Sequence, residues 1–240
     1  MIGDLFHTAI YLPLYNGLIF LIDVVPGGDV GIAVILLTIL VRTILFPLAH
    51  QAIKTQISLR LVTPKLEEIQ KKYKENKEEQ VKQTFALYKE YGIRPFTPIL
   101  TLLMQIPIII GLYFVFLNAG LPHIDAASLY SFVPIPEAPQ MDFLGFIDMA
   151  GKSIILAALA GITQFVYAKL SFPAPDKGGE GFKHDFARSF HIQVLYVFPV
   201  LMGVLAYSIS AAIALYFVVG NLFSIMQELL VHRRMRPRSS

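Results

Sequence analysis

The sequence predicts an all-α integral membrane protein with five transmembrane helices. Hydrophobic residues make up 55% of the 240 positions and charged residues only 15%, and the mean hydropathy is +0.60. Soluble domains carry about 25% charged residues, so most of this chain belongs in lipid. A helix that crosses a hydrocarbon core of about 30 Å needs about 20 apolar residues. We predict spans at residues 30–49, 98–117, 153–170, 192–207 and 211–231, with the small, polar stretch "AYSISAA" (206–212) as the turn between the last two.

The N-terminal segment is apolar but less uniform than the five predicted spans. Polar residues such as His7, Asn16 and Asp23 are scattered through residues 5–25. This pattern predicts a helix that lies in the membrane interface, and we assign residues 1–29 to an extracytoplasmic amphipathic helix. A cleaved signal peptide is not expected, because the segment has neither a basic start nor a small-residue cleavage site. Cysteine is absent from the chain, which excludes disulfides and thiolate metal sites.

The basic residues predict the orientation of the chain. Of the 20 Lys and Arg residues, ten lie in residues 50–97, four in 169–191 and four in the C-terminal tail. The loop at 119–149 and residues 1–29 contain no basic residue. Segments rich in Lys and Arg stay in the cytoplasm. We therefore expect the N-terminus outside the membrane and the C-terminus in the cytoplasm.

The first cytoplasmic segment, residues 51–96, is predicted to form a helical hairpin. Thr63 and Pro64 resemble the N-cap and first position of a helix, and Gly92 is placed to end the second helix. This hairpin is either a solvated spacer or a docking arm for a partner or the membrane surface. Apolar residues at helical spacing mark one face on each helix, and these candidates for docking are Leu66, Ile69 and Tyr73 on the first helix and Val81, Phe85 and Tyr88 on the second.

The run "LLTILVRTILFPL" (36–48) contains a single charged residue, Arg42. It lies about 18 Å into a span that begins near Val30, given a rise of 1.5 Å per residue. One interpretation is an arginine that extends to the cytoplasmic headgroups, and the other is a charge that faces a water-filled cavity. The middle of the other spans contains no acidic residue, and Glu228 late in the last span is the nearest candidate. Arg42 therefore needs water or a visiting anion, which favours the cavity.

Polar residues in four of the spans support the cavity interpretation. Each of them could instead bond a neighbouring helix, which is the commoner use of such groups in membranes. Together they are harder to explain in that way, because they lie in the middle or inner halves of their spans. The residues are Thr38 in the first span, Thr101 and Gln105 in the second, Thr163, Gln164 and Tyr167 in the third, and Asn221, Ser224 and Glu228 in the fifth.

Three stretches resemble the YidC-type membrane protein insertases, the bacterial relatives of the mitochondrial Oxa and chloroplast Alb proteins. They are "ILLTILVRTILFPL" (35–48), "YGIRPFTPILTLLMQIPIIIGLYFVF" (91–116) and "ALYFVVGNLFSIMQ" (214–227). The resemblance covers about residues 5–235 and implies five helices around a hydrophilic groove that opens to the cytoplasm and the lipid. Arg42 falls on the family's groove arginine and Gln164 on its groove glutamine. Phe217 falls where relatives often carry an aromatic residue, commonly Trp or Tyr.

The resemblance implies a chaperone and insertase for nascent membrane proteins in the bacterial inner membrane. It implies contact with membrane lipids and suggests the Sec translocon, the signal-recognition machinery and the ribosome as further partners, but not DNA. Since insertion makes and breaks no bond, we expect no catalytic residue, no cofactor and no metal. Two features depart from the family: the chain lacks Trp, and Arg94–Pro95 replaces the usual Asn-Pro. The basic tail is also short, which puts ribosome contact by this tail in doubt.

Two other classes of protein are weighed against the insertase. A secondary transporter would need paired repeats with broken helices, and this chain shows no internal repeat. An intramembrane enzyme would need interacting acid, base or nucleophilic groups, whereas the polar residues within the spans are mainly amides and hydroxyls without a base.

Overall fold

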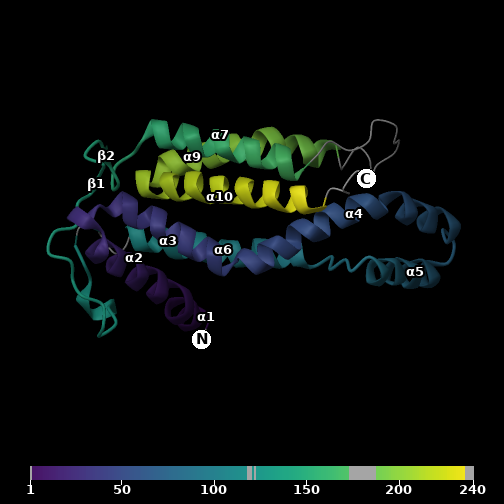
Figure 1. The fold of residues 1–240 in the computed structure, drawn as a ribbon, viewed down its shortest axis with the longest axis horizontal. Coiled ribbons are helices and arrows are strands. Elements are labelled where there is room, and N and C mark those ends of the chain that lie inside the picture. Colours follow the sequence, from purple (N-terminus) through teal and green to yellow (C-terminus); the bar gives the residue numbers. More distant parts are fainter. Residues whose placement is uncertain (1, 118–120, 122, 173–187, 236–240) are drawn as a thin grey trace. The chain divides into compact units, whose positions relative to one another are not determined.

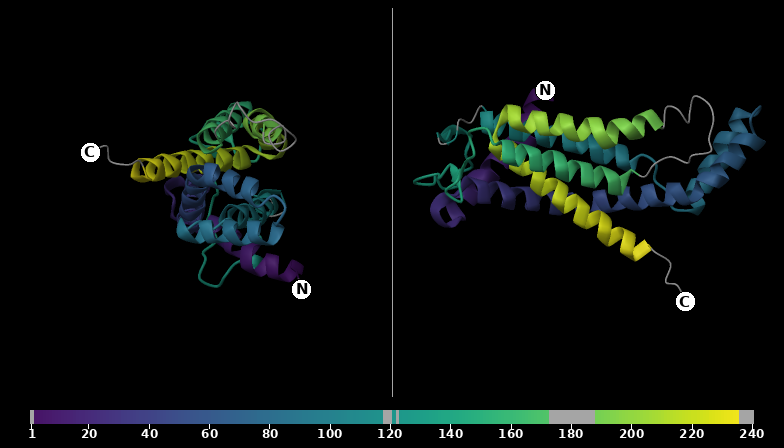
Figure 2. Two further views of the ribbon diagram at one scale, coloured as in Figure 1. Left: turned by 90° about the vertical axis from the view of Figure 1, so that its right-hand side faces the viewer. Right: turned by 90° about the horizontal axis from the view of Figure 1, so that it is seen from above.

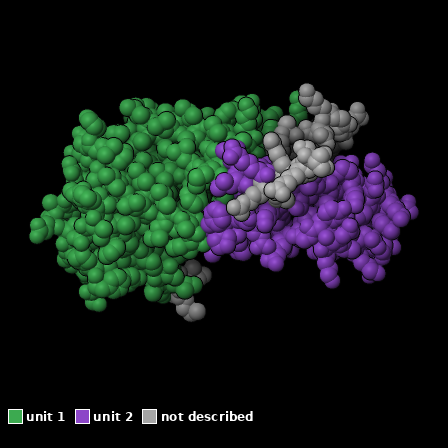
Figure 3. Space-filling model, in the orientation of Figure 1, with its two compact units in different colours: residues 1–44, 106–228 green, residues 45–105, 229–240 purple. Residues whose placement is uncertain are grey.

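A computed structural model describes residues 2–117, 121, 123–172 and 188–235. The chain divides into two compact units, which are coloured separately in Figure 3. Unit 1 contains Met1–Ile44 and Ile106–Glu228, and unit 2 contains Leu45–Gln105 and Leu229–Ser240. The predicted fold class, an all-α integral membrane protein, is confirmed by the long apolar helices described below.

Helices account for most of the described chain, and Figure 1 labels them along the sequence. The N-terminal part runs through α1 (Ile2–Phe6), a π-helical turn (His7–Tyr11), α2 (Leu12–Val24), a short turn (Pro26–Gly28) and α3 (Val30–Ile44). Helices α4 (Phe46–Lys72) and α5 (Lys77–Glu90) form the hairpin of unit 2. The remaining helical elements are α6 (Thr97–Leu117), a 3-10 turn (Ala126–Ser128), α7 (Ile154–Ser171), a π-helical turn (Gln193–Val197), α9 (Phe198–Ile209) and α10 (Ala211–Met235).

The long apolar helices cover the predicted spans. By length and composition, Ile154–Ser171, Arg188–Ile209 and Ala211–Arg233 are each sufficient to cross a membrane. Val30–Ile44 qualifies only together with Phe46–Lys72, from which it is separated by a bend of 61°. The predicted span 98–117 lies within α6. The continuous N-terminal helix Gly3–Val24 also meets these criteria, so the interfacial position of this segment stays a prediction.

The core of unit 1 is a large apolar cluster to which α2, α3 and α10 contribute fully buried side chains such as Leu18, Val30 and Ala214. Figure 2 shows α7, α9 and α10 as neighbouring helices of this unit. Many apolar side chains on α7 and α9 point outward, and Ile155 and Val200 are each more than 60% exposed. Exposed apolar surface of this extent is rare on soluble monomers and fits helices that contact lipid.

The loop between α6 and α7 is tied to the start of unit 1 by buried polar side chains. Asn16 accepts a hydrogen bond from the Tyr130 amide (2.6 Å) and donates one to the Ser128 carbonyl (2.9 Å). Asp29 accepts from the Ile32 amide at the start of α3 and from the Leu144 amide (2.8 Å) between strands β1 (Asp142–Phe143) and β2 (Ile147–Asp148). These bonds give Asn16 and Asp29 a structural role that the sequence pattern did not reveal.

The prediction that a hairpin helix starts at Thr63–Pro64 is wrong. Helix α4 begins at Phe46 with Pro47 in its first turn and continues through Pro64 to Lys72. The Thr63 hydroxyl donates to the Leu59 carbonyl (2.9 Å) instead of capping a new helix. A proline inside a helix removes one backbone hydrogen bond, and packing of the adjacent Val62, which is fully buried in the core of unit 2, favours the continuous helix over a break.

Helix α5 has a clear local signal at each end. The Asn76 side chain accepts from the Glu79 amide (3.0 Å) as an N-cap, which satisfies one of the unpaired amides of the first turn. At the other end Gly92 has a φ of +62°, and the Ile93 amide bonds the Tyr88 carbonyl (2.8 Å). This left-handed glycine and six-to-one hydrogen bond form a Schellman motif, so the prediction that Gly92 ends the helix is confirmed.

Candidate functional site

Arg42 lies in the last turn of α3, and its guanidinium packs against α10 within unit 1. A Cβ atom placed on Gly220 would lie 2.8 Å from the Nη2 atom of Arg42 and 3.3 Å from its Nε atom. The absence of a side chain at Gly220 therefore makes room for the guanidinium. Arg42 is half-buried, and its Nε group has no hydrogen-bond acceptor among the described residues. An arginine in this state retains hydrogen-bonding capacity for water or an anion.

The α10 helix presents a stripe of residues around this contact. Phe217, Asn221, Ser224 and Glu228 follow one another at spacings of three and four residues, and Gly220 lies directly before Asn221, which places all five on one side of the helix. The side chains of Phe217, Asn221 and Glu228 are buried. Phe217 and Asn221, which were predicted from the sequence, therefore lie on the face of α10 that also meets Arg42.

Asn221 joins α10 to α7. Its Nδ2 group donates to the hydroxyl of Thr163 (3.2 Å) and weakly to the carbonyl of Ala160 (3.4 Å). The Thr163 hydroxyl in turn donates to the Leu159 carbonyl (2.8 Å) within its own helix. Because buried amides in a membrane need internal partners, this contact holds the two helices together beside Arg42.

Tyr167 of α7 lies near both Arg42 and Glu228. Its hydroxyl shares a hydrogen bond with the hydroxyl of Ser171, and the side chain interacts electrostatically with both Glu228 and Arg42. Glu228 is eight residues beyond Gly220, so its backbone lies about 12 Å farther along the α10 axis. The acid and the arginine thus occupy different levels of the bundle, and Tyr167 is electrostatically coupled to both.

The other predicted groove residues have different surroundings. Thr38 is buried, and its hydroxyl donates to the Val34 carbonyl (2.7 Å) inside α3. Gln164 is half-buried on α7, directly after Thr163. Gln105 is half-buried at the end of unit 2, so its place in a shared groove stays a prediction.

Gly220 of this cluster was not predicted from the sequence, whereas Tyr167 was among the polar residues that support the cavity interpretation. A glycine in the middle of an apolar span indicates close approach by another group, but it does not identify that group. Tyr167 follows Thr163 by four residues and therefore continues the same polar face. The place of Tyr167 on this face is therefore visible in the sequence, whereas the partner of Gly220 requires the tertiary structure.

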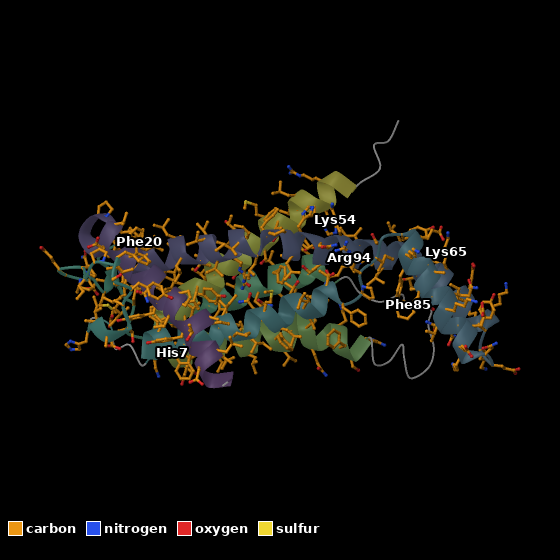
Figure 4. The ribbon with its side chains drawn as sticks, turned by 90° about the horizontal axis from the view of Figure 1, so that it is seen from below. His7, Phe20, Lys54, Lys65, Phe85 and Arg94 are labelled. Atoms are coloured by element: carbon orange, nitrogen blue, oxygen red, sulfur yellow. The ribbon has the colours of Figure 1, made fainter. Side chains whose placement is uncertain are left out.

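The six predicted docking residues of the hairpin differ in how much of their surface is exposed. Leu66, Ile69 and Tyr88 pack against the buried core of unit 2. Val81 and Phe85 on α5 are 53% and 56% exposed, and Figure 4 shows Phe85 at the surface of the hairpin.

Tyr73, the last of the six, is half-buried at the end of α4, with the Lys72 ammonium 5.3 Å from the centre of its ring. Val81 and Phe85 are therefore the two predicted docking residues that leave most of their surface available to a partner.

The hairpin also contains a contact between its two arms. The Lys65 ammonium donates to the Tyr91 hydroxyl (2.5 Å) and lies over the ring of that residue. This hydrogen bond, together with the attraction of Tyr91 and nearby Glu90 and Glu68, raises the pKa of Lys65. Within the described ranges, no group of three or more His, Asp or Glu side chains is placed to hold a metal ion.

Long apolar helices with an arginine packed between two of them define a multi-pass membrane protein with a polar internal site. Comparison with known proteins identifies the family. The profile of the family described as 60Kd inner membrane protein matches residues 21–238, and the chain belongs to this family.

Relatives that are each named membrane protein insertase YidC match most of this chain. The protein from Clostridium tetani is 30% identical over 90% of this chain and 87% of its own length. The protein from Oceanobacillus iheyensis is 31% identical over 87% and 76%, respectively. A longer relative from Francisella tularensis is 29% identical over 86% of this chain and 33% of its own length. These relatives support insertase function, and together with the apolar helices they support a multi-pass inner membrane protein.

Proposed function

We propose that this protein inserts nascent membrane proteins through a hydrophilic groove bounded by α3, α7 and α10 of unit 1. The observation that carries the proposal is Arg42, a half-buried guanidinium packed on Gly220 with its Nε group without a described acceptor. Asn221 of α10 bonds Thr163 of α7, which directly precedes Gln164, and Phe217 lies one turn before Asn221. An unsatisfied arginine inside a membrane bundle is costly unless water or an anion reaches it.

In the proposed mechanism, the hydrophobic segment of a client protein moves along the lipid-facing surfaces of α7 and α10. Its short polar or acidic flank enters the groove, where the Arg42 guanidinium supplies a counter-charge. Removing a charged flank from water costs several kcal/mol per ion, and a wet groove that reaches partway through the membrane shortens the dry distance. The interaction with Arg42 has to remain weak, because a tight ion pair would retain the client.

The charge of Arg42 is tested by insertion into proteoliposomes that contain only the purified protein. A small single-span client with an acidic outer flank is translated, and protease protection is compared between wild type, Arg42→Lys, Arg42→Gln, Arg42→Ala and empty liposomes. We expect Arg42→Lys to retain more insertion activity than Arg42→Gln, since lysine keeps the positive charge.

Equal activity of the lysine and glutamine variants would rule out the electrostatic role of Arg42. If wild type protects no more client than empty liposomes, the proposal of autonomous insertion fails. Thermal unfolding of each variant in detergent separates a loss of function from a loss of folding.

We also propose that the N-terminus lies outside the membrane, and that the hairpin and C-terminus lie in the cytoplasm. The Sec translocon, the signal-recognition machinery and the ribosome remain candidate partners on that side. The concentration of Lys and Arg in the hairpin and tail supports this orientation.

The chain has no cysteine, so single-cysteine variants can report this orientation in intact cells. With a membrane-impermeant maleimide, Ala127→Cys is expected to react from outside and Lys77→Cys only after the membrane is opened; the reverse pattern would overturn the orientation. Gly3→Cys then tests the N-terminal helix. It reacts from outside if this helix lies in the interface, but only after the membrane is opened if the helix crosses the membrane.

A further inference from the structure

Unit 2 contains a pocket of about 410 Å³ that is separate from the Arg42 site. One wall is the start of α4, which contributes Gln51, Lys54, Thr55 and Ser58, while Tyr91 and Val231 lie on other walls. We propose that this pocket binds the phosphate of an anionic lipid headgroup. The site goes beyond the proposed insertase activity, and its test does not depend on insertion.

The lining of the pocket suits an anion. Gln51, Lys54, Thr55 and Ser58 lie at spacings of three and four residues, so one face of α4 carries an ammonium, two hydroxyls and an amide. Lys54 is exposed, whereas Thr55 is buried in the wall. Among the described lining residues, none carries a carboxylate. Phosphate oxygens form strong, charge-assisted hydrogen bonds with ammonium and guanidinium groups.

Arg94 adds a second cation beside this wall. In the amide orientation of Gln51 that satisfies both residues, its side-chain oxygen accepts hydrogen bonds from the Nη1 (2.9 Å) and Nε (3.0 Å) groups of Arg94. These bonds use two of the five N–H donors of the Arg94 guanidinium and fix its orientation. Figure 4 shows Lys54 and Arg94 in the same region of unit 2. A guanidinium that bonds the lining residue Gln51, together with the ammonium of the lining residue Lys54, is a suitable pair of cations for a phosphate group.

The position of the pocket in the sequence favours a lipid as the source of the phosphate. The lining residue His50 directly follows the predicted span 30–49, Tyr91 and Gly92 come shortly before α6, and Val231 ends the predicted span 211–231. Each of these segments is therefore near the level at which an apolar helix meets the lipid headgroups.

Side chains next to the pocket residues also favour a lipid as the ligand. Phe96 is 70% exposed two residues after Arg94 and is suited to the acyl region below a headgroup. Glu90, the acid beside Tyr91, interacts with Lys65. Basic residues at this level attract anionic lipids, and the pocket supplies a defined place for one of them.

Lipid binding is tested by native mass spectrometry of the full-length protein in detergent, titrated with phosphatidylglycerol or with zwitterionic phosphatidylcholine. We expect phosphatidylglycerol to bind wild type more tightly, and Lys54→Gln with Arg94→Gln to weaken that binding about tenfold or more. Lys54→Arg is expected to retain most of the affinity. The matched control is Lys71→Gln, which removes the same charge from an exposed position on α4 that lies about 25 Å from Lys54.

The proposal fails if the double variant binds phosphatidylglycerol as wild type does, or if Lys71→Gln weakens binding equally. It also fails if inorganic phosphate at millimolar concentration displaces the lipid, because the site would then take the free anion. Displacement of the lipid by an RNA hairpin that itself depends on Lys54 and Arg94 would assign the pocket to nucleic acid instead.

Discussion

Unit 1 and unit 2 differ in how their helices are held in place. In unit 1, α7 and α9 approach closely through two glycines, and a Cβ on Gly203 would lie 3.3 Å from the Ala157 carbonyl oxygen and 3.9 Å from the Gly161 Cα. In unit 2, a small buried core is combined with local signals at the helix ends, of which Asn76 and Gly92 are the clearest. Helices in lipid gain little from burying apolar surface against each other. Close backbone contact therefore has a larger role in unit 1, and hydrophobic burial and caps have a larger role in unit 2.

The comparison predicts the largest loss of stability at the α7–α9 contact. Gly203→Leu places a branched side chain against the backbone of α7, which has no flexible group to move aside, and overpacking of this kind costs about 1–3 kcal/mol. We expect a lower thermal midpoint in detergent and a separation of α7 from α9. Gly3→Leu is the control, because a Cβ there meets nothing within 4 Å. A midpoint for Gly203→Leu equal to that of the control would show that this contact does not hold unit 1 together.

A smaller and more local effect is expected at Gly92. A Cβ on Gly92 also meets nothing within 4 Å, so Gly92→Ala adds only the cost of a left-handed backbone at φ +62°, about 1 kcal/mol. Hydrogen exchange is expected to accelerate at the end of α5 and around Ile93, but not in α7 or α10. Gly3→Ala, at another open position, serves as its control. Acceleration that extends equally into unit 1 would contradict the separate behaviour of the two units.

The smallest effect on stability, with a large effect on function, is expected at Gly220. The nearest atom to an added Cβ is Nη2 of Arg42 at 2.8 Å, and this is the end of a flexible side chain that can move. Gly220→Ala should therefore change the free energy of unfolding by no more than about 1 kcal/mol, with a thermal midpoint close to that of wild type, while displacing the guanidinium. In the proteoliposome assay we expect insertion to fall toward the level of Arg42→Ala. Wild-type insertion by Gly220→Ala would show that packing of the Arg42 guanidinium against Gly220 is not required for insertion.

The sequence by itself determined the fold class, the helices over the predicted spans and the end of the hairpin at Gly92. These features depend on composition, on the length of apolar runs and on local backbone preferences, all of which are properties of neighbouring residues. The same local signals misplaced the start of the first hairpin helix at Thr63–Pro64, because a buried neighbour, Val62, outweighs one missing backbone hydrogen bond.

Only the tertiary structure decided which residues meet. Arg42 and Gly220 are separated by 178 positions in the sequence and become neighbours because α3 packs against α10. Asn221 likewise finds Thr163 on α7, while Thr38 bonds within its own helix. Apolar periodicity specifies that a helix forms and where it ends, but helices in lipid are selected as partners by shape and by a few polar contacts. Such contacts join positions far apart in the chain, so the contact of Arg42 with Gly220 could not be predicted from the sequence.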